Sequence, residues 1–262
     1  MFSVRIRCGS VRDDIDVVVR FSRRPRRVVS IVPSLTESIA VTRPEVLVGA
    51  TDWCSRPANL DVTRVRGTKN PDVEQIVALH PDVVVANAEE NRPADLQRLR
   101  DLSVPVWVTA PTTVPAALDS LGRMFDALGI DRPAWLHQAA EDWSGPAVAP
   151  TRHAVVPIWR RPWMALGRDT FAGDLMAKLG VANVLDAHHE RYPRIRLDHL
   201  PPYDLVVLPD EPYRFSETDG PEAFPGVDHA CVSGRHLTWY GPSLAEARGV
   251  LPEQLQTVRT DG

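Results

Sequence analysis

The chemically capable side chains of this sequence gather in short loops that directly follow apolar, strand-like runs. Glu89, Glu90 and Arg92 follow the apolar run at residues 83–86. Two adjacent carboxylates beside a guanidinium could bind a cation or the polar edge of a ligand. In the alternative interpretation, Asn91 caps the following helix and both glutamates are solvated. Both interpretations predict a polar loop at the carboxyl end of a buried strand.

Aromatic side chains mark the other loops of this kind. Tryptophan and tyrosine offer broad, stiff apolar faces with one polar edge, which suits them to hold a flat or bulky ligand. Partial burial in the core is the alternative. Ligands of open parallel sheets bind outside the carboxyl ends of the strands. We therefore predict that ligand-binding residues come from these loops: Ser34, Trp53, Cys54, Lys69, Glu89, Glu90, Arg92, Trp159, Trp163, Glu211, Tyr213, Trp239 and Tyr240.

An enzyme is the main alternative to a binding protein. It would use Cys54, or the pair Glu89 and Glu90, as acid, base or metal ligand, and Cys54 would then need a depressed pKa. The sequence contains no GxSxG, GxGxxG or HxxxH pattern, so no catalytic residue is assigned. His188 and His189 precede Glu190 directly, and because neighbouring side chains point in different directions we do not expect them to chelate one metal. The metal-binding residues are left unassigned.

Composition excludes several classes of partner. The net charge is -4 and the arginines are scattered, so no basic stripe is available for nucleic acid. Three widely spaced cysteines argue against a disulfide framework or a thiolate zinc site. No window approaches 18 consecutive apolar residues, so no membrane span is expected. The N-terminus lacks an apolar run of secretory length, which predicts a cytoplasmic protein.

The alternation of apolar runs with amphipathic patterns predicts an α/β fold of two lobes with mainly parallel sheets. An N-terminal β-hairpin is expected within residues 1–25, from strands at 2–7 and 15–21. The first lobe spans 26–112. One long backbone helix, broken near 129–133, joins the lobes over 113–146. The second lobe spans 147–262, with strands expected at 154–159, 205–208 and 236–239 and helices at 171–179 and 244–255.

Three stretches resemble the periplasmic-binding-protein family that carries cobalamin, haem and iron siderophores: VVSIVPSLTE at 28–37, DVEQIVALHPDVVV at 72–85 and LTWY at 237–240. The similarity covers roughly residues 26–258 and is greatest to the cobalamin carriers of vitamin importers and to the branch described as helical backbone metal receptors. It implies two α/β lobes joined by a rigid helix, with cobalamin or another metal chelate as ligand. It places Trp53, Trp159, Trp163 and Trp239 in the ligand cleft.

The resemblance also implies a partner. In the cobalamin carriers an acidic residue on each lobe docks on an ABC permease, and these positions match Glu74 and Asp198. The N-terminus argues against this role, since such a carrier must be exported. We therefore expect a small-molecule ligand, a corrinoid or metal chelate, to bind in the interlobe cleft of an intracellular substrate-binding-protein fold. A scaffold whose N-terminal hairpin adds an edge to another protein's sheet is the third hypothesis.

Overall fold

The computed structural model of the chain describes residues 10–146 and 148–256. The chain folds into two compact units. Unit 1 comprises the chain through Pro111, together with Leu118–His137 and Tyr240–Pro242. Unit 2 comprises Thr112–Ala117, Gln138–Trp239 and the chain from Ser243 onward. Each unit has its own parallel sheet, as the alternating sequence pattern predicts.

The sheet of unit 1 has five parallel strands. Their order across the sheet is β5 (Thr63–Arg64), β4 (Leu47–Ala50), β3 (Val28–Ser30), β8 (Val83–Asn87) and β9 (Val106–Thr109). Strands β3, β8 and β9 are buried along their whole length, which is why they consist of valine-rich runs without polar alternation. Strand β9 has one neighbour, β8, and forms an edge of the sheet.

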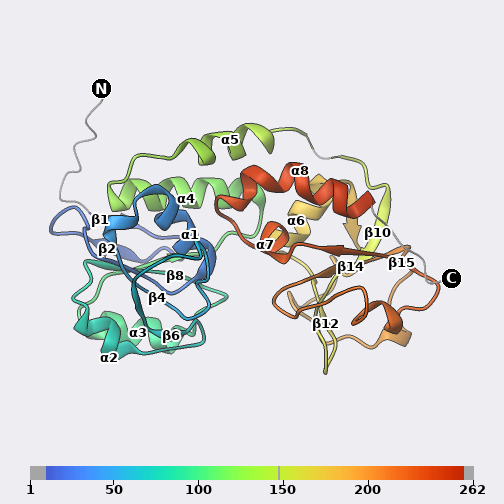
Figure 1. Ribbon diagram of the computed structural model, residues 1–262, viewed down its shortest axis with the longest axis horizontal. Helices are drawn as coiled ribbons and strands as arrows, with labels where there is room; N and C mark the ends of the chain where they lie inside the picture. Colours follow the sequence, from blue (N-terminus) through green and yellow to red (C-terminus); the bar gives the residue numbers. More distant parts are fainter. Residues whose placement is uncertain (1–9, 147, 257–262) are drawn as a thin grey trace. The chain divides into compact units, whose positions relative to one another are not determined.

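Helices cover this sheet. Figure 1 shows α2 (Val73–Ala78) and α3 (Pro93–Asp101) below it and α4 (Val114–Leu128) above it. Residues of α2 and α3 form one buried cluster with β3, β8 and β9, including Val73, Ile76, Leu96 and Leu99. Helix α1 (Pro33–Thr42) follows β3 and is followed by the short helix η1 (Pro44–Val46). Helix α1 starts at Pro33, whose fixed φ suits the first turn, and no side chain caps it.

The predicted N-terminal hairpin is present, with a different turn. Strands β1 (Ser10–Arg12) and β2 (Val18–Arg20) pair antiparallel, so the turn expected at residues 9–14 is wrong. The turn occupies 13–17 because the Asp13 carboxylate accepts hydrogen bonds from the N–H groups of Ile15 and Val17. The strand expected at 2–7 lies outside the described residues. A second small antiparallel pair joins β6 (Arg66–Gly67) to β7 (Asn70–Pro71).

The helical span after residue 113 is divided into α4 (Val114–Leu128) and α5 (Ala134–Asp142), and the break falls where the sequence pattern was interrupted. Gly129 has a φ of 65°, and Ile130 N–H donates to Phe125 O at 2.9 Å. This left-handed residue after the last turn closes the helix, a conformation that glycine adopts without a Cβ penalty. Both helices begin in one unit and end in the other.

The sheet of unit 2 has four parallel strands, in the order β13 (Val181–Asn183), β10 (Arg152–Val155), β14 (Leu205–Pro209) and β15 (Asp228–Val232). Helices α6 (Phe171–Lys178), α7 (Gly234–Thr238) and α8 (Ser243–Gln256) lie together above it (Figure 1). The strand expected at 236–239 is wrong. Leu237 N–H donates to Ser233 O, and the Thr238 hydroxyl donates to Gly234 O, so these residues form a helical turn.

The other side of this sheet is covered by irregular chain and a short antiparallel pair, β11 (Pro157–Trp159) and β12 (Met164–Ala165). Phe215 and Phe224 pack there against Val206 and Leu208 of β14. Two short helices, η2 (Leu197–His199) and η3 (Pro221–Ala223), belong to the same irregular chain. The α/β fold with parallel sheets is therefore confirmed. Among the described residues, no helix combines the length and apolar character needed to cross a lipid bilayer.

A carboxylate at the start of β8 generates the first prediction. Asp82 is partly desolvated, but hydrogen bonds from the Arg26 N–H, the Arg23 side chain and the Arg27 N–H hold its pKa below the usual value. A depressed carboxyl pKa contributes stability above the unfolded-state pKa and loses it as pH falls through the folded-state pKa. We expect Asp82→Asn to lower the free energy of unfolding by about 2 kcal/mol at pH 7, measured by urea denaturation.

The same variant should flatten the loss of stability below about pH 4, because the titrating group is gone. Asp101→Asn is the matched control, since Asp101 is exposed and accepts only a surface hydrogen bond from Gln97. An equal loss of stability in both variants would contradict this role of Asp82.

Candidate ligand-binding site

Two buried amide side chains build the loop that follows β8. Asn91 Oδ1 accepts a hydrogen bond from Asn87 N–H at 2.9 Å, and Asn91 Nδ2 donates to the carbonyls of Ile31 and Thr68 at 3.2 and 2.9 Å. Asn87 Oδ1 accepts from the N–H groups of both Glu89 and Glu90. The expectation that Asn91 caps α3 is therefore wrong: the N-cap is Arg92, and Asn91 instead joins three backbone segments.

The acidic loop is fixed in position by these bonds. Glu89 and Glu90 are half-buried, and Lys69 Nζ donates to the Glu89 carbonyl. Lys69 lies in the turn between β6 and β7, and this bond joins that turn to the loop of Glu89. Arg92 is exposed and forms an ion pair with Asp95 at 2.8 Å, so its guanidinium is turned along α3. Lys69, Glu89 and Glu90 form the charged part of the candidate site in unit 1.

Cys54 lies in the loop after β4 and is buried completely. Its Sγ accepts a hydrogen bond from the Thr36 hydroxyl at 3.0 Å and lies 3.1 Å from the Thr51 hydroxyl. Burial raises the pKa of the Cys54 thiol, the two hydroxyl contacts offset part of this rise, and the negative charge of Glu90 adds to it. The enzyme hypothesis needs the opposite shift, because the thiolate is the nucleophile. The prediction that Cys54 contacts a ligand directly is also corrected, because the side chain is buried.

Tyr240 is a second correction. Its hydroxyl accepts a hydrogen bond from Asn87 Nδ2 at 2.7 Å and lies 2.7 Å from the Thr109 hydroxyl, inside unit 1. Burial raises the pKa of the Tyr240 phenol. The side chain is 5% exposed and joins the carboxyl ends of β8 and β9, so it packs the unit and offers no face to a ligand. Ser34 is likewise buried, on the first turn of α1.

Trp53 has the opposite placement. It follows β4, and its side chain is 70% exposed, beside the β6–β7 turn where its Nε1 would lie 3.3 Å from a Cβ on Gly67. Arg64 fixes the backbone of this loop by donating to the carbonyls of Thr51, Cys54 and Leu60. An ordered loop thus holds an indole in solvent, which is the arrangement expected of a ligand platform.

In unit 2 the structure brings three predicted residues, Trp159, Trp163 and Tyr213, into one group of rings. With Phe215 and Phe224 they form what we call the Trp163 cluster. Trp163 stacks on Phe215 at a centroid distance of 5.9 Å and meets Phe224 edge-on at 5.5 Å. Trp159 meets Tyr213 edge-on at 5.7 Å and is 44% exposed. The cluster is therefore packed at its base and open at Trp159.

Charged groups border the Trp163 cluster. Arg160 forms ion pairs with Asp219 and Glu222, and its guanidinium lies 5.2 Å from the centre of the Trp163 ring. The Tyr213 hydroxyl donates to Asp219 Oδ2 at 2.7 Å, and this bond to a carboxylate raises the pKa of Tyr213. A neutral phenol that already donates its proton is a poor metal ligand. The arrangement supports binding by contact and hydrogen bonding.

Two further predicted residues of unit 2 lie apart from this cluster. Trp239 is half-buried at the end of α7, and among the described residues its indole shares no ring contact with the Trp163 cluster. Glu211 follows β14, and its backbone packs so closely on Gly234 that a Cβ there would lie 2.8 Å from Glu211 N. The sequence pattern thus located the right loops but did not separate their exposed side chains from the packed ones.

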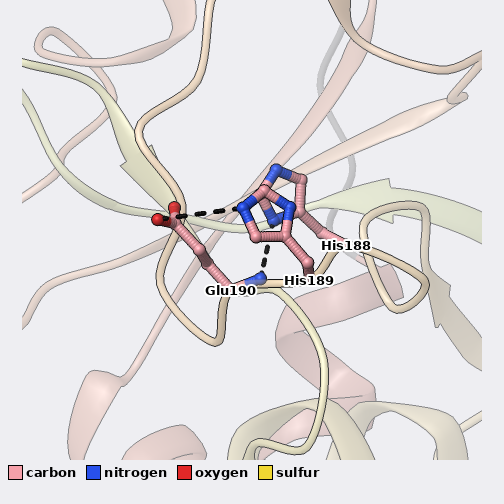
Figure 2. Close-up of side chains that lie close together, drawn as sticks. All are labelled: His188, His189 and Glu190. Carbon is pink, nitrogen blue, oxygen red and sulfur yellow. Dashed lines mark hydrogen bonds and ion pairs between the residues drawn. The ribbon is translucent and has the colours of Figure 1, made fainter.

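His188, His189 and Glu190 correct an expectation of the sequence analysis. One ligand atom from each lies within 4.8 Å of the others, so neighbouring side chains do converge here (Figure 2). His188 Nδ1, however, accepts the Glu190 N–H at 3.0 Å, which places the imidazole proton on Nε2. The two rings stack at 4.4 Å with planes 25° apart. As placed, the group offers a cation only His189 and Glu190.

The two acidic residues expected to dock a partner are both exposed, one in each unit. Glu74 lies on α2 with its side chain 78% exposed and forms an ion pair with Arg98 of α3. Asp198 lies in η2 with its side chain 64% exposed and forms an ion pair with Arg196 at 2.9 Å. Surface ion pairs of this kind contribute little to stability, so these carboxylates can exchange partners.

Sequence reasoning missed the residues that support the site. Asn87, Arg160 and Asp219 are the main examples, and Asn91 was considered only as a helix cap. Asn87 ends β8 and Arg160 follows β11, so position was their one signal, whereas Asp219 lies well beyond the end of β14 and had none. Nothing in the sequence showed which backbone carbonyls or carboxylates their side chains would meet.

Comparisons with known proteins identify the fold and family. A family model described as periplasmic binding protein matches residues 28–204. The vitamin B12-binding protein of Pectobacterium carotovorum subsp. carotovorum is 32% identical over 102 residues, which are 37% of this chain and 37% of that protein. The match therefore spans little more than a third of that relative.

Two solved structures share the fold. The periplasmic vitamin B12 binding protein of Vibrio cholerae superposes with a TM-score of 0.66 at 16% identity, covering 89% of this chain and 97% of that one. The periplasmic haem-binding protein of Roseiflexus sp. RS-1 superposes with a TM-score of 0.68 at 17% identity, covering 87% and 97%. At these identities the likeness concerns the fold.

The buried thiol generates a second prediction. In a variant carrying Cys8→Ser and Cys231→Ser, we expect Cys54 to react with a disulfide reagent at pH 8 at least about 100-fold more slowly in the folded than in the urea-unfolded chain, because burial suppresses the thiolate. The control carries Cys8→Ser and Cys54→Ser and keeps the half-buried Cys231. A reactivity inflection of Cys54 below pH 7 would instead favour the enzyme hypothesis.

Proposed function

This chain belongs to the periplasmic binding protein family, and we propose that it binds a corrinoid or haem-type metal chelate. The relatives support this ligand class, since one is a vitamin B12-binding protein and another a haem-binding protein. The proposal concerns binding alone, because Cys54, the strongest nucleophile candidate, is buried with a raised pKa.

One observation carries the proposal: Trp53 and Trp159 are the two large aromatic side chains that the described part of the chain leaves exposed. Exposing an indole forfeits roughly 2 kcal/mol of burial free energy or more. Each is held by an ordered surrounding, Trp53 by the loop that Arg64 fixes and Trp159 by its edge-on contact with Tyr213. Flat apolar macrocycles are the ligands that such rings contact best.

The charged groups beside these rings suit the polar rim of such a chelate. Lys69 and the carboxylates of Glu89 and Glu90 lie in the loops of unit 1, and Arg160 and Asp219 border the rings of unit 2. Corrinoids carry amide side groups and haems carry carboxylates, and both groups form hydrogen bonds with side chains of these types. Because the Tyr213 phenol is engaged by Asp219, ligand recognition by contact is favoured over direct metal coordination there.

Absorbance and tryptophan-fluorescence titration tests this proposal. The probes are cyanocobalamin, hydroxocobalamin, haemin and a ferric siderophore chelate. We expect saturable binding of at least one, and Trp53→Ala and Trp159→Ala should each weaken it by at least about tenfold, the loss of about 1.4 kcal/mol expected for one aromatic contact. Because both side chains are exposed, neither change should lower the thermal midpoint appreciably.

Leu102→Ala is the matched control, an exposed apolar side chain of unit 1 outside the candidate site. It should leave the affinity unchanged. Absence of any spectral change and of any fluorescence quenching with all four probes would overturn the proposal.

Delivery to an ABC permease is the second part of the proposal. It rests on the exposed carboxylates of Glu74 and Asp198, which can leave their weak surface ion pairs for arginines of a partner. The cytoplasmic location expected from the N-terminus stays a prediction and has no support from the relatives, since the Vibrio cholerae and Roseiflexus proteins are described as periplasmic.

In proteoliposomes that contain an ABC permease for the bound ligand, Glu74→Lys should reduce uptake of that ligand at least about tenfold, because a cation there repels the docking arginines. Glu45→Lys is the control, since Glu45 is also exposed in unit 1 and paired with an arginine. Ligand affinity in solution should be the same for both variants. Equal uptake by both would remove the docking role of Glu74.

A further inference from the structure

A groove of about 320 Å³ runs along the free edge of β9 in unit 1. The whole of β2 and the residue before it, Val17, line one side, and residues 103–106 with Arg100 line the other. The hairpin that forms one wall precedes residues 28–204, the stretch matched by the family model. One wall of the groove therefore lies outside the stretch matched by the family model, and the other lies inside it.

The β9 side of the groove presents backbone groups. Val84 pairs with Val106 in the parallel ladder, and Val84 N–H donates to Pro105 O at 2.8 Å. In a parallel ladder, alternate residues of a strand bond to one neighbour, so Val106 directs its N–H and C=O away from β8. Val106 lines the groove. The next such residue, Val108, is already covered, since its C=O accepts from Asp14 N–H and its N–H donates to Asp13 Oδ2.

The hairpin side presents backbone groups as well. Asp13 N–H donates to Val17 O, and Val11 pairs with Val19. Because hydrogen-bonded and non-bonded pairs alternate in an antiparallel ladder, Val18 and Arg20 direct their N–H and C=O groups away from β1. Both residues line the groove. Two strands thus run along the groove without pairing to each other.

Arg100 lies in the groove, at the end next to the hairpin turn at residues 13–17. Its Nη2 is buried, has no hydrogen-bond partner and lies 4.0 Å from Asp13 Oδ2. The Asp13 carboxylate already accepts hydrogen bonds from the N–H groups of Ile15, Val17 and Val108. A buried donor without a partner is costly, and a carboxylate would satisfy it with a charge-assisted bond.

We propose that this groove binds the C-terminal segment of a partner protein as an added β-strand, with the terminal carboxylate on Arg100. The peptide runs parallel to β9 and antiparallel to β2, because Arg100 and the closed turn lie at the end toward which β9 runs. Main-chain bonds to Val106, Val18 and Arg20 hold about three residues, the length of β2. The valine walls favour apolar side chains on the peptide.

The experiment uses the full chain and an array of fluorescein-labelled hexapeptides whose last three positions are varied among Val, Ile, Leu, Phe, Ser and Thr. We expect a subset to bind by fluorescence anisotropy, and their C-terminal amides to bind at least about tenfold more weakly. Arg100→Gln should cause a similar loss. Arg98→Gln, on the exposed face of the same helix, should leave binding unchanged.

Amide hydrogen exchange provides the readout at the strand edges. The N–H groups of Val18, Arg20 and Val106 should exchange readily in the free chain and become protected with a bound peptide. Three results would overturn the proposal: no peptide of the array binds, free carboxylates and amides bind equally, or the three amides are already protected without peptide. The comparison of acid and amide peptides uses the unaltered chain, so it stands even where Arg100→Gln fails to fold.

Discussion

Buried polar groups at the carboxyl ends of the strands are the constraint on which the rest of unit 1 depends. A parallel strand that ends inside the protein leaves backbone groups that water cannot reach, and these must find partners. Asn87 and Asn91 supply them, bonding to β3, β9, the β6–β7 turn and the acidic loop. These bonds fix the backbone of the loop, and so hold Glu89 and Glu90 in one place.

In unit 2, aromatic side chains and one arginine hold the irregular chain against the sheet. One face of its sheet is covered by helices and the other by irregular chain, in which Phe215 and Phe224 supply the buried area. Arg160 lies over Trp163 and pairs with Asp219 and Glu222, so the loops before and after β14 are joined by charge as well as packing. An ordered aromatic surface presents its face at a small cost in conformational entropy when a ligand binds.

The N-terminal hairpin covers part of the open edge of the unit 1 sheet. Asp14 accepts hydrogen bonds from Ala110 N–H, the Ser120 hydroxyl and the Arg123 side chain, so one carboxylate fastens the hairpin to both the sheet and α4. Exposed edges invite pairing with other chains. The hairpin covers the edge at Val108 and leaves it open at Val106, which confines pairing to a short, bordered groove.

The core of the fold followed from local pattern. The run at residues 83–86 is β-branched and uniformly apolar, which requires a strand buried on both faces, and the structure has β8 there. The helical spacing of Val73 and Ile76 is typical of an amphipathic helix, and the structure has α2 there, with Asp72 as its N-cap. The prediction of a strand at 236–239 was wrong because a short apolar and aromatic stretch is compatible with the periodicity of a strand and with that of a helix. Tertiary packing decided for the helix.

The sequence by itself determined the alternation of strands and helices in unit 1, the parallel arrangement of the sheets and most of the loops that carry chemically capable side chains, because these depend on the spacing of apolar residues along the chain. Only the tertiary structure decided which of those side chains reach solvent. Trp53 and Tyr240 were both expected to contact a ligand, yet one is 70% exposed and the other 5%. The difference lies in partners distant in sequence, Asn87 and Thr109 for Tyr240, and such pairings exist only once the chain has folded.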